Sequence, residues 1–136
     1  MSYKNIISIT NINGTGGKIE ASDGMKINLK PPMIEKPSDQ LTPMHLIGMA
    51  WSACLNSTIE SIFDSNKIAN KIRVRVEVEA KHNRAHGYHY ILIAYVAVED
   101  YDEKETLKVA RHAHRLCPIS KLIAENEFVS LAYEVY

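Results

Sequence analysis

The sharpest pattern along the chain is a strict alternation of apolar and charged residues over 72–80, which reads IRVRVEVEA. The apolar residues fall on one side of an extended chain, and the arginines and glutamates fall on the other. This period of two predicts a strand with one buried and one solvated face. The polar stretch HNRAHG separates it from the more apolar segment 88–100, so we expect these two segments to form a long hairpin.

A second pattern, with helical spacing, covers residues 44–63. Thr42 followed by Pro43 is typical of a helix start, because threonine caps the first turn and proline fits the first helical position. A helix that is apolar on many sides is expected to lie centrally, inside a wrapping sheet or at a subunit interface. The apolar stripe and the residues that widen it are Ile47, Ala50, Trp51, Cys54, Leu55, Thr58, Ile59, Ile62 and Phe63.

The remaining elements are shorter. We expect short strands in 3–30, a proline-rich loop in 31–43, an amphipathic helix in 102–116, a short helix in 119–126 and a last strand in 127–136. The order βββ-α-ββ-α-α-β indicates an α+β fold built on antiparallel sheet. A chain of 136 residues is long enough to bury a core of its own, so we expect a single domain, 1–136.

Composition narrows the choice of function. Sixteen basic residues balance sixteen acidic ones, which argues against a general nucleic-acid-binding protein. No apolar run approaches the roughly 20 residues that span a bilayer, and the N-terminus lacks the apolar core of a secretory signal. We therefore expect neither nucleic acid nor membrane as a partner. We expect a cytoplasmic protein whose two cysteines are reduced, catalytic or sensing rather than joined in a permanent disulfide.

The two cysteines, Cys54 and Cys117, differ in their expected surroundings. Cys117 precedes Pro118, so we expect it to cap a helix, where free backbone N–H groups and the helix dipole favour a thiolate. From the residues alone, a reactive thiol, a metal ligand and a small apolar residue all remain open for Cys117. Cys54 lies about three turns inside its helix, beyond the reach of the helix dipole. The alternative to a functional role for Cys54 is that it simply packs as a small apolar residue.

The six histidines do not form a known metal motif. His112 and His114 are two residues apart, so they point away from each other on a helix. Three others cluster around the hairpin turn, where an exposed role is expected: His82, His86 and His89. We therefore predict no metal site. The GxSxG elbow of serine hydrolases is also missing from the sequence, so nothing supports a Ser-His-Asp triad.

Three stretches together carry a resemblance to a known family. They are GTGGKIEASDG at 14–24, TPMHLIGMAWSACL at 42–55 and AHRLCPIS at 113–120. They resemble the glycine-rich turn and the two cysteine motifs of the OsmC/Ohr family, the osmotically inducible and organic-hydroperoxide-resistance proteins. The resemblance covers essentially the full length, and the two cysteine motifs stand at matching spacing.

This resemblance implies a fold, a chemistry and partners. The implied fold is OsmC-like, with antiparallel sheets wrapped around a central buried helix in an intertwined homodimer. The implied chemistry is that of a thiol peroxidase without a cofactor: Cys54 attacks an organic hydroperoxide and becomes a sulfenic acid, and Cys117 resolves it as a disulfide. A dithiol such as a lipoyl protein then restores the thiols. Met44, Met49 and Trp51 are expected to form apolar walls around the substrate.

The chain departs from the family at its two activating positions. Thr15 stands where the family has the arginine of its glycine-rich turn, and Met44 stands where it has a glutamate. Without the guanidinium, burial within an apolar helix is expected to raise the pKa of Cys54. Candidate supporting residues are Lys18, His114 and Arg115, although Lys18 is also explained as a solvated strand residue.

These departures favour an alternative function. It is a weakly active or non-catalytic protein of the same fold, which senses redox state or binds a small apolar ligand beside Cys54.

Overall fold

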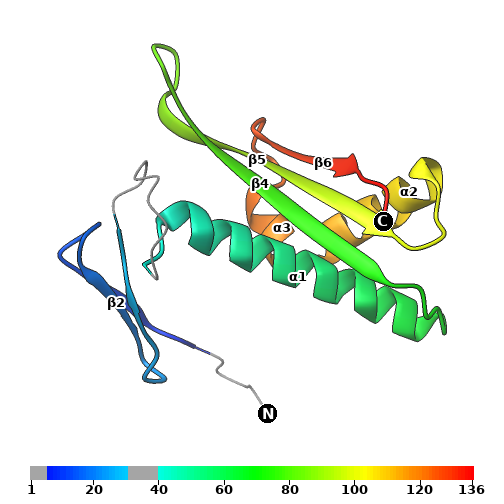
Figure 1. Ribbon diagram of the computed structural model, residues 1–136, viewed down its shortest axis with the longest axis horizontal. Helices are drawn as coiled ribbons and strands as arrows, with labels where there is room; N and C mark the ends of the chain where they lie inside the picture. The colour runs from blue at the N-terminus through cyan, green and yellow to red at the C-terminus, as the bar shows by residue number, and fades with distance from the viewer. Residues whose placement is uncertain (1–5, 31–39) are drawn as a thin grey trace. The chain divides into compact units, whose positions relative to one another are not determined.

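The computed structural model describes residues 6–30 and 40–136, which form six strands and three helices in the predicted order (Figure 1). This mixture of sheet and helix confirms the predicted α+β class. The described chain divides into two compact units, residues 1–46 and residues 47–136. Most of the predicted proline-rich loop, residues 31–39, lies outside the described part of the chain.

The N-terminal unit carries an antiparallel sheet of three short strands, as predicted. They are β1 (Ile9–Ile12), β2 (Lys18–Ala21) and β3 (Lys26–Asn28), in the order β1-β2-β3. The turn between β1 and β2 depends on Gly17, where a Cβ atom would lie 1.9 Å from the carbonyl oxygen of Ile12. Only glycine fits so close an approach, which explains one glycine of this glycine-rich turn.

The C-terminal unit is built on a second sheet, in the order β4-β5-β6. β4 (Ile72–Asn83) and β5 (Gly87–Val98) form the predicted hairpin. β6 (Val129–Tyr133) is parallel to β5, so the expectation of purely antiparallel sheet is wrong at this pairing. Two helices connect β5 to β6, and such a crossover returns the chain to the end of the sheet at which β5 begins.

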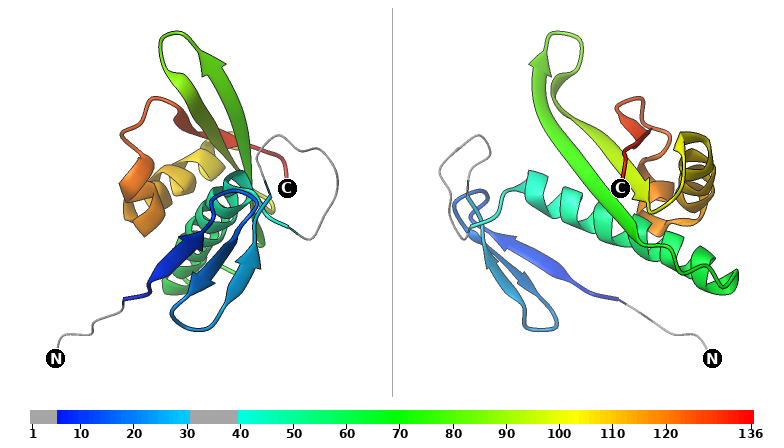
Figure 2. Two further views of the ribbon diagram at one scale, coloured as in Figure 1. Left: turned by 90° about the vertical axis from the view of Figure 1, so that its left-hand side faces the viewer. Right: turned by 45° about the vertical axis from the view of Figure 1, so that its right-hand side comes forward.

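Side chains of the three helices and of this sheet form one hydrophobic core, and Figure 2 shows the helices beside the strands. α1 (Pro43–Ser65) is followed later in the chain by α2 (Glu103–Leu116) and α3 (Pro118–Ile123). The helix start that Thr42 predicts is confirmed, since its Oγ1 accepts a hydrogen bond from the His45 amide at 3.3 Å. Leu92, Ala94, Val96 and Val98 of β5 form the centre of the core together with Ala110 and Ala113 of α2.

α1 buries one line of side chains at intervals of four residues. The line consists of Trp51, Leu55, Ile59 and Phe63, all at most 2% exposed. Ala50, which belongs to the predicted apolar stripe, is exposed in the single chain, as is Ala53. The sequence therefore predicts the helix correctly. The apolar surface that it predicts for α1 is wider than the surface buried within one chain.

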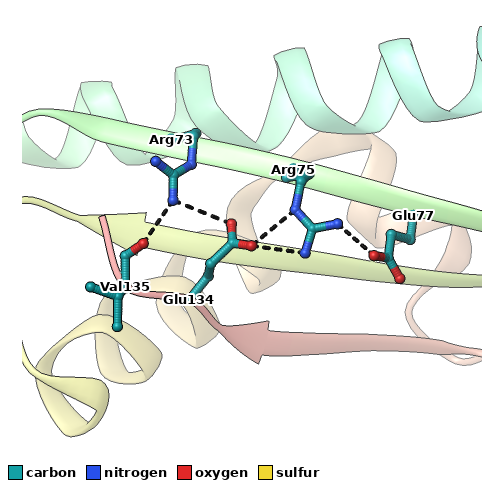
Figure 3. Close-up of polar contacts among 5 residues, drawn as sticks. All are labelled: Arg73, Arg75, Glu77, Glu134 and Val135. Atoms are coloured by element: carbon teal, nitrogen blue, oxygen red, sulfur yellow. Dashed lines mark hydrogen bonds and ion pairs between the residues drawn. The ribbon is translucent and has the colours of Figure 1, made fainter.

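The polar face of β4 is exposed, as its alternation predicts, but its charges are also paired (Figure 3). Arg75 forms an ion pair with Glu134, which follows β6, at 2.8 Å, and the guanidinium lies 4.3 Å from the ring centre of Tyr95. Arg73 donates a hydrogen bond to the carbonyl oxygen of Val135 at 2.8 Å. These contacts connect the first strand of the sheet to the C-terminal segment across β5.

Candidate functional site

Cys117 occupies the junction of two helices. Its amide donates to the carbonyl oxygen of Ala113 at 2.7 Å, which ends α2, and its Sγ accepts from the Ser120 amide at 3.5 Å, which begins α3. Pro118 follows as the first residue of α3. The predicted N-cap is therefore confirmed, and its sequence signal was the Cys-Pro pair.

The thiol of Cys117 is fully buried, yet its surroundings favour the thiolate. Burial by itself raises the pKa of Cys117, but the hydroxyl and amide of Ser120, the Cys54 thiol and the Ile119 amide together lower it. The indole Nε1 of Trp51 donates to Ser120 Oγ at 2.9 Å within the core. Because this bond uses Ser120 Oγ as an acceptor, the serine hydroxyl proton remains free to point at the sulfur.

Cys54 lies on α1 and is half buried. Burial raises its pKa, the adjacent Cys117 thiol raises it further, and the Ile119 amide opposes both. The predicted upward shift of the Cys54 pKa is therefore confirmed. The two free thiols interact with each other, and of the pair Cys117 is the better stabilised thiolate.

Cys54 opens onto a cleft of about 600 Å³. Its walls come from one side of α1, from the last two turns of α2 and from the start of α3. The described residues that line it are Cys54, Ser57, Thr58, Ser61, Ile62, Ser65, Asn66, His112, Leu116 and Pro118. Cys117 lies beneath this surface, so Cys54 is the member of the pair that faces the cleft.

The expected apolar walls are not those of this cleft. Trp51 belongs to the buried line of α1 and holds Ser120, and Met49 is 51% exposed on another side of the helix. Neither side chain lines this cleft, so a role of Met49 and Trp51 in a substrate pocket stays a prediction. Met44 lies in the N-terminal unit, in the first turn of α1.

The three candidate supporting residues differ in their surroundings. His114 is half buried, its ring centre is 6.1 Å from that of Trp51, and burial lowers its pKa, so its neutral form is favoured. Arg115 is exposed near the end of α2. Lys18 lies on β2 of the N-terminal unit and forms an ion pair with Glu20 at 3.0 Å, which matches the expectation of a solvated strand residue.

The histidines of the hairpin turn contact aromatic rings. His86 and His89 both lie against Phe128, with ring centres 4.9 and 4.6 Å away. Within residues 6–30 and 40–136, no group of three or more histidine, cysteine or acidic side chains is arranged to hold a metal ion. No helix among the same residues is long and apolar enough to cross a membrane.

Sequence reasoning missed two parts of the site. The link from Trp51 to Ser120 joins residues 69 positions apart, and no local pattern announces it. The serine row of the cleft has a visible signal, since Ser57, Ser61 and Ser65 recur every four residues on α1.

Comparison with known proteins assigns the chain to a family. A family model described as OsmC-like protein matches residues 36–131. The chain belongs to the OsmC/Ohr family. Organic hydroperoxide resistance protein-like 2 of Staphylococcus epidermidis is 27% identical over 124 residues, which cover 87% of each chain. A similarly named protein of Mycoplasma pneumoniae is 26% identical and covers 87% of this chain and 86% of its own.

Solved structures confirm the OsmC-like fold. Organic hydroperoxide resistance protein OhrB of Bacillus subtilis matches with a TM-score of 0.78 at 20% identity, over 96% of this chain and 98% of its own. An organic hydroperoxide resistance protein of Legionella pneumophila matches with a TM-score of 0.80 at 20% identity, over 98% of each chain. The resemblance seen in the two cysteine motifs therefore extends to the whole fold of an OsmC/Ohr protein.

Proposed function

We propose that this OsmC/Ohr protein is a cysteine-based thiol peroxidase that reduces organic hydroperoxides to alcohols. The observation that carries the proposal is the meeting of two free thiols, of which Cys54 faces an open cleft and Cys117 lies beneath it. Relatives named for organic hydroperoxide resistance support the same chemistry.

The two sulfurs have different roles in the reaction, because only Cys54 is accessible from the cleft. Cys54 Sγ attacks the terminal oxygen of the hydroperoxide, the O–O bond breaks, and Cys54 becomes a sulfenic acid while the alkoxide leaves as the alcohol. The Cys117 thiolate then attacks the sulfenic sulfur, forms the Cys54–Cys117 disulfide and releases hydroxide, which solvent protonates to water. Because Cys117 is buried, it reaches the Cys54 sulfur but not a substrate in the cleft.

Cys117 also supplies the activation that Cys54 lacks. Of the two thiols Cys54 holds its proton more tightly, because burial raises the pKa of Cys54, whereas Ser120 and the start of α3 lower the pKa of Cys117. We propose that the Cys117 thiolate accepts this proton during attack and afterwards returns it to solvent, while water in the open cleft protonates the departing alkoxide. Cys117 is then a thiolate again, ready to close the disulfide. This relay supplies the activation that the family obtains from its arginine and glutamate. In this chain those two positions are occupied by Thr15 and Met44.

The remaining partners follow from the same chemistry. The disulfide needs an external dithiol, such as a lipoyl protein, which is oxidised to its own disulfide as the two cysteines are reduced. Two free thiols in the resting state fit a reducing cytoplasm. A homodimer would cover the side of α1 on which Met49, Ala50 and Ala53 are exposed.

Stopped-flow oxidation by cumene hydroperoxide tests the proposal. Wild type should react far faster than free cysteine, and the Cys54→Ser variant should not. In the Cys117→Ser variant, Cys54 sulfenic acid should accumulate and be trapped by dimedone, because no second thiol can close the disulfide. A wild-type rate no faster than that of free cysteine would refute the peroxidase.

One observation favours a second candidate function, a redox sensor or a binder of small apolar ligands. Thr15 and Met44 remove the activating side chains of the family, and the pKa of Cys54 is raised. Turnover separates the two functions. With dihydrolipoamide present, a peroxidase consumes many equivalents of hydroperoxide per chain, whereas a sensor stops after one.

A further inference from the structure

The first turn of α1 is closed by reciprocal hydrogen bonds between Thr42 and His45. The His45 amide donates to Thr42 Oγ1 at 3.3 Å, and the Thr42 amide donates to His45 Nδ1 at 3.1 Å. The same ring nitrogen lies 2.7 Å from Thr42 Oγ1. This is the arrangement of a capping box, in which the third helical residue is usually glutamate or glutamine. Here a histidine has that position, so the helix start depends on a side chain that can take up a proton.

The hydrogen bonds determine which nitrogen of the His45 ring carries the proton. A backbone amide can only donate, so His45 Nδ1 accepts from the Thr42 amide and must present a lone pair. The Thr42 hydroxyl therefore also donates to this nitrogen. The proton of the neutral ring then lies on Nε2, on a side chain that is exposed to solvent. The capping box is complete only while His45 is neutral.

A proton on His45 Nδ1 breaks this arrangement. The Thr42 hydroxyl can reverse its role and accept from Nδ1, but the Thr42 amide has no such alternative. Thr42 is only 5% exposed, so its amide has little access to water that could replace the lost acceptor. A buried donor without a partner destabilises the structure that holds it. The closed first turn therefore disfavours the protonated ring.

The charges around the helix start act in the same direction. The first turn of α1 has no acidic residue, and α1 has no lysine, arginine or acidic residue before Glu60. The described segment that hydrogen-bonds to Leu41 is 28–30, and its charged side chain is that of Lys30. A proton on His45 thus adds a positive charge at the positive end of the helix dipole, with no carboxylate in residues 28–30 or 43–59 to offset it.

We propose that the capping box of Thr42 and His45 is a pH-sensitive device, which keeps the first turn of α1 closed while His45 is neutral and opens it when His45 takes up a proton. The closed turn excludes a proton that the opened segment accepts. Its stability is therefore present at high pH and is lost as pH falls through the range in which histidines titrate, about pH 8 to 5. The two compact units of the chain meet in sequence after Leu46, so the opening occurs where the chain passes from one unit to the other. The inference does not depend on the peroxidase function.

Hydrogen exchange of the first-turn amides tests the inference. In wild type, the protection factors of the His45 and Leu46 amides, corrected for the intrinsic exchange rate at each pH, should fall about fivefold between about pH 7.5 and about pH 5, the effect of losing one cap interaction. In His45→Gln they should stay within about twofold, because glutamine keeps an acceptor at this position but does not titrate. His82→Gln is the control: it removes a titratable ring on β4, leaves the capping box intact and should show the wild-type fall.

A spectroscopic measurement tests the assigned tautomer without any substitution. The nitrogen-15 chemical shifts of the His45 ring in the neutral form should place its proton on Nε2. A proton on Nδ1 would overturn the inference. Protection factors that are the same at both pH values in wild type would also overturn it, as would an equal fall in wild type and His45→Gln.

Discussion

At the scale of single residues, position in a helix explains why the two thiols differ. Cys54 lies inside α1, where the backbone N–H groups are already bonded within the helix, so burial dominates and its pKa rises. Cys117 stands at the start of α3, where unpaired N–H groups and the Ser120 hydroxyl face its sulfur. Trp51 fixes Ser120 from the core.

We therefore predict that Ser120→Ala raises the pKa of Cys117. The substitution removes the hydroxyl that donates to the thiolate and leaves the indole N–H of Trp51 without its acceptor. The ultraviolet absorbance of the thiolate, followed against pH in the Cys54→Ser background, measures the shift. Ser130→Ala, at an exposed serine of β6, is the control. An unchanged titration in Ser120→Ala would contradict this assignment.

A second prediction concerns the proton relay. Cys117→Ser keeps an N-cap side chain at the start of α3 but removes the thiolate that accepts the Cys54 proton. Formation of the Cys54 sulfenic acid should slow by about 100-fold, a usual contribution of general base catalysis. Stopped-flow fluorescence with the single-cysteine variant measures this step alone. If Cys117 acted only as a resolving thiol, the first step would keep the wild-type rate.

At the scale of elements, the C-terminal sheet is stabilised by ion pairs between its strands as well as by its hydrophobic core. β4 and β6 are separated by β5, yet Arg75 of β4 reaches Glu134 just after β6 (Figure 3). The hydrogen bond from Arg75 holds the pKa of Glu134 below its usual value, assisted by Arg73. Ionised Glu134 is thus favoured in the folded chain.

Glu134→Gln should therefore destabilise the protein in a pH-dependent way. A carboxylate whose pKa is lowered by folding stabilises the fold above its unfolded pKa, and that stability is lost as pH falls through the folded pKa. The melting temperature of the variant should lie below that of wild type at neutral pH, and the gap should close in acid. Glu125→Gln, at an exposed glutamate, is the control. A gap that persists in acid would contradict the ion-pair origin.

Periodicity was enough to predict the elements but not all of their pairings. The alternation of β4 and the helical stripe of α1 reflect burial on one face, which a sequence records directly. The direction of β6 depends on the crossover formed by α2 and α3, which no local pattern specifies. The hydrogen bond from Trp51 to Ser120 was not predicted for a similar reason, because the two residues lie 69 positions apart in the sequence.

At the scale of the whole molecule, the family assignment and the site support the same chemistry from different evidence. Residues 36–131 match the family model, and both cysteine motifs lie within that range. The resemblance of these two motifs to the family was enough to pair Cys54 with Cys117. The better stabilised thiolate, Cys117, was predicted from the Cys-Pro pair at the start of α3 and not from the resemblance, and the contribution of the Ser120 hydroxyl was not predicted.

The central claim is that Cys54 and Cys117 act as one redox pair. It is tested most directly by adding one equivalent of cumene hydroperoxide to the reduced protein, counting free thiols with time and mapping the peptides. We predict that both thiols disappear together and that a Cys54–Cys117 disulfide accounts for the product. The loss of a single thiol would contradict the account. So would the retention of both thiols at a time when free cysteine, in a parallel reaction, has already been oxidised.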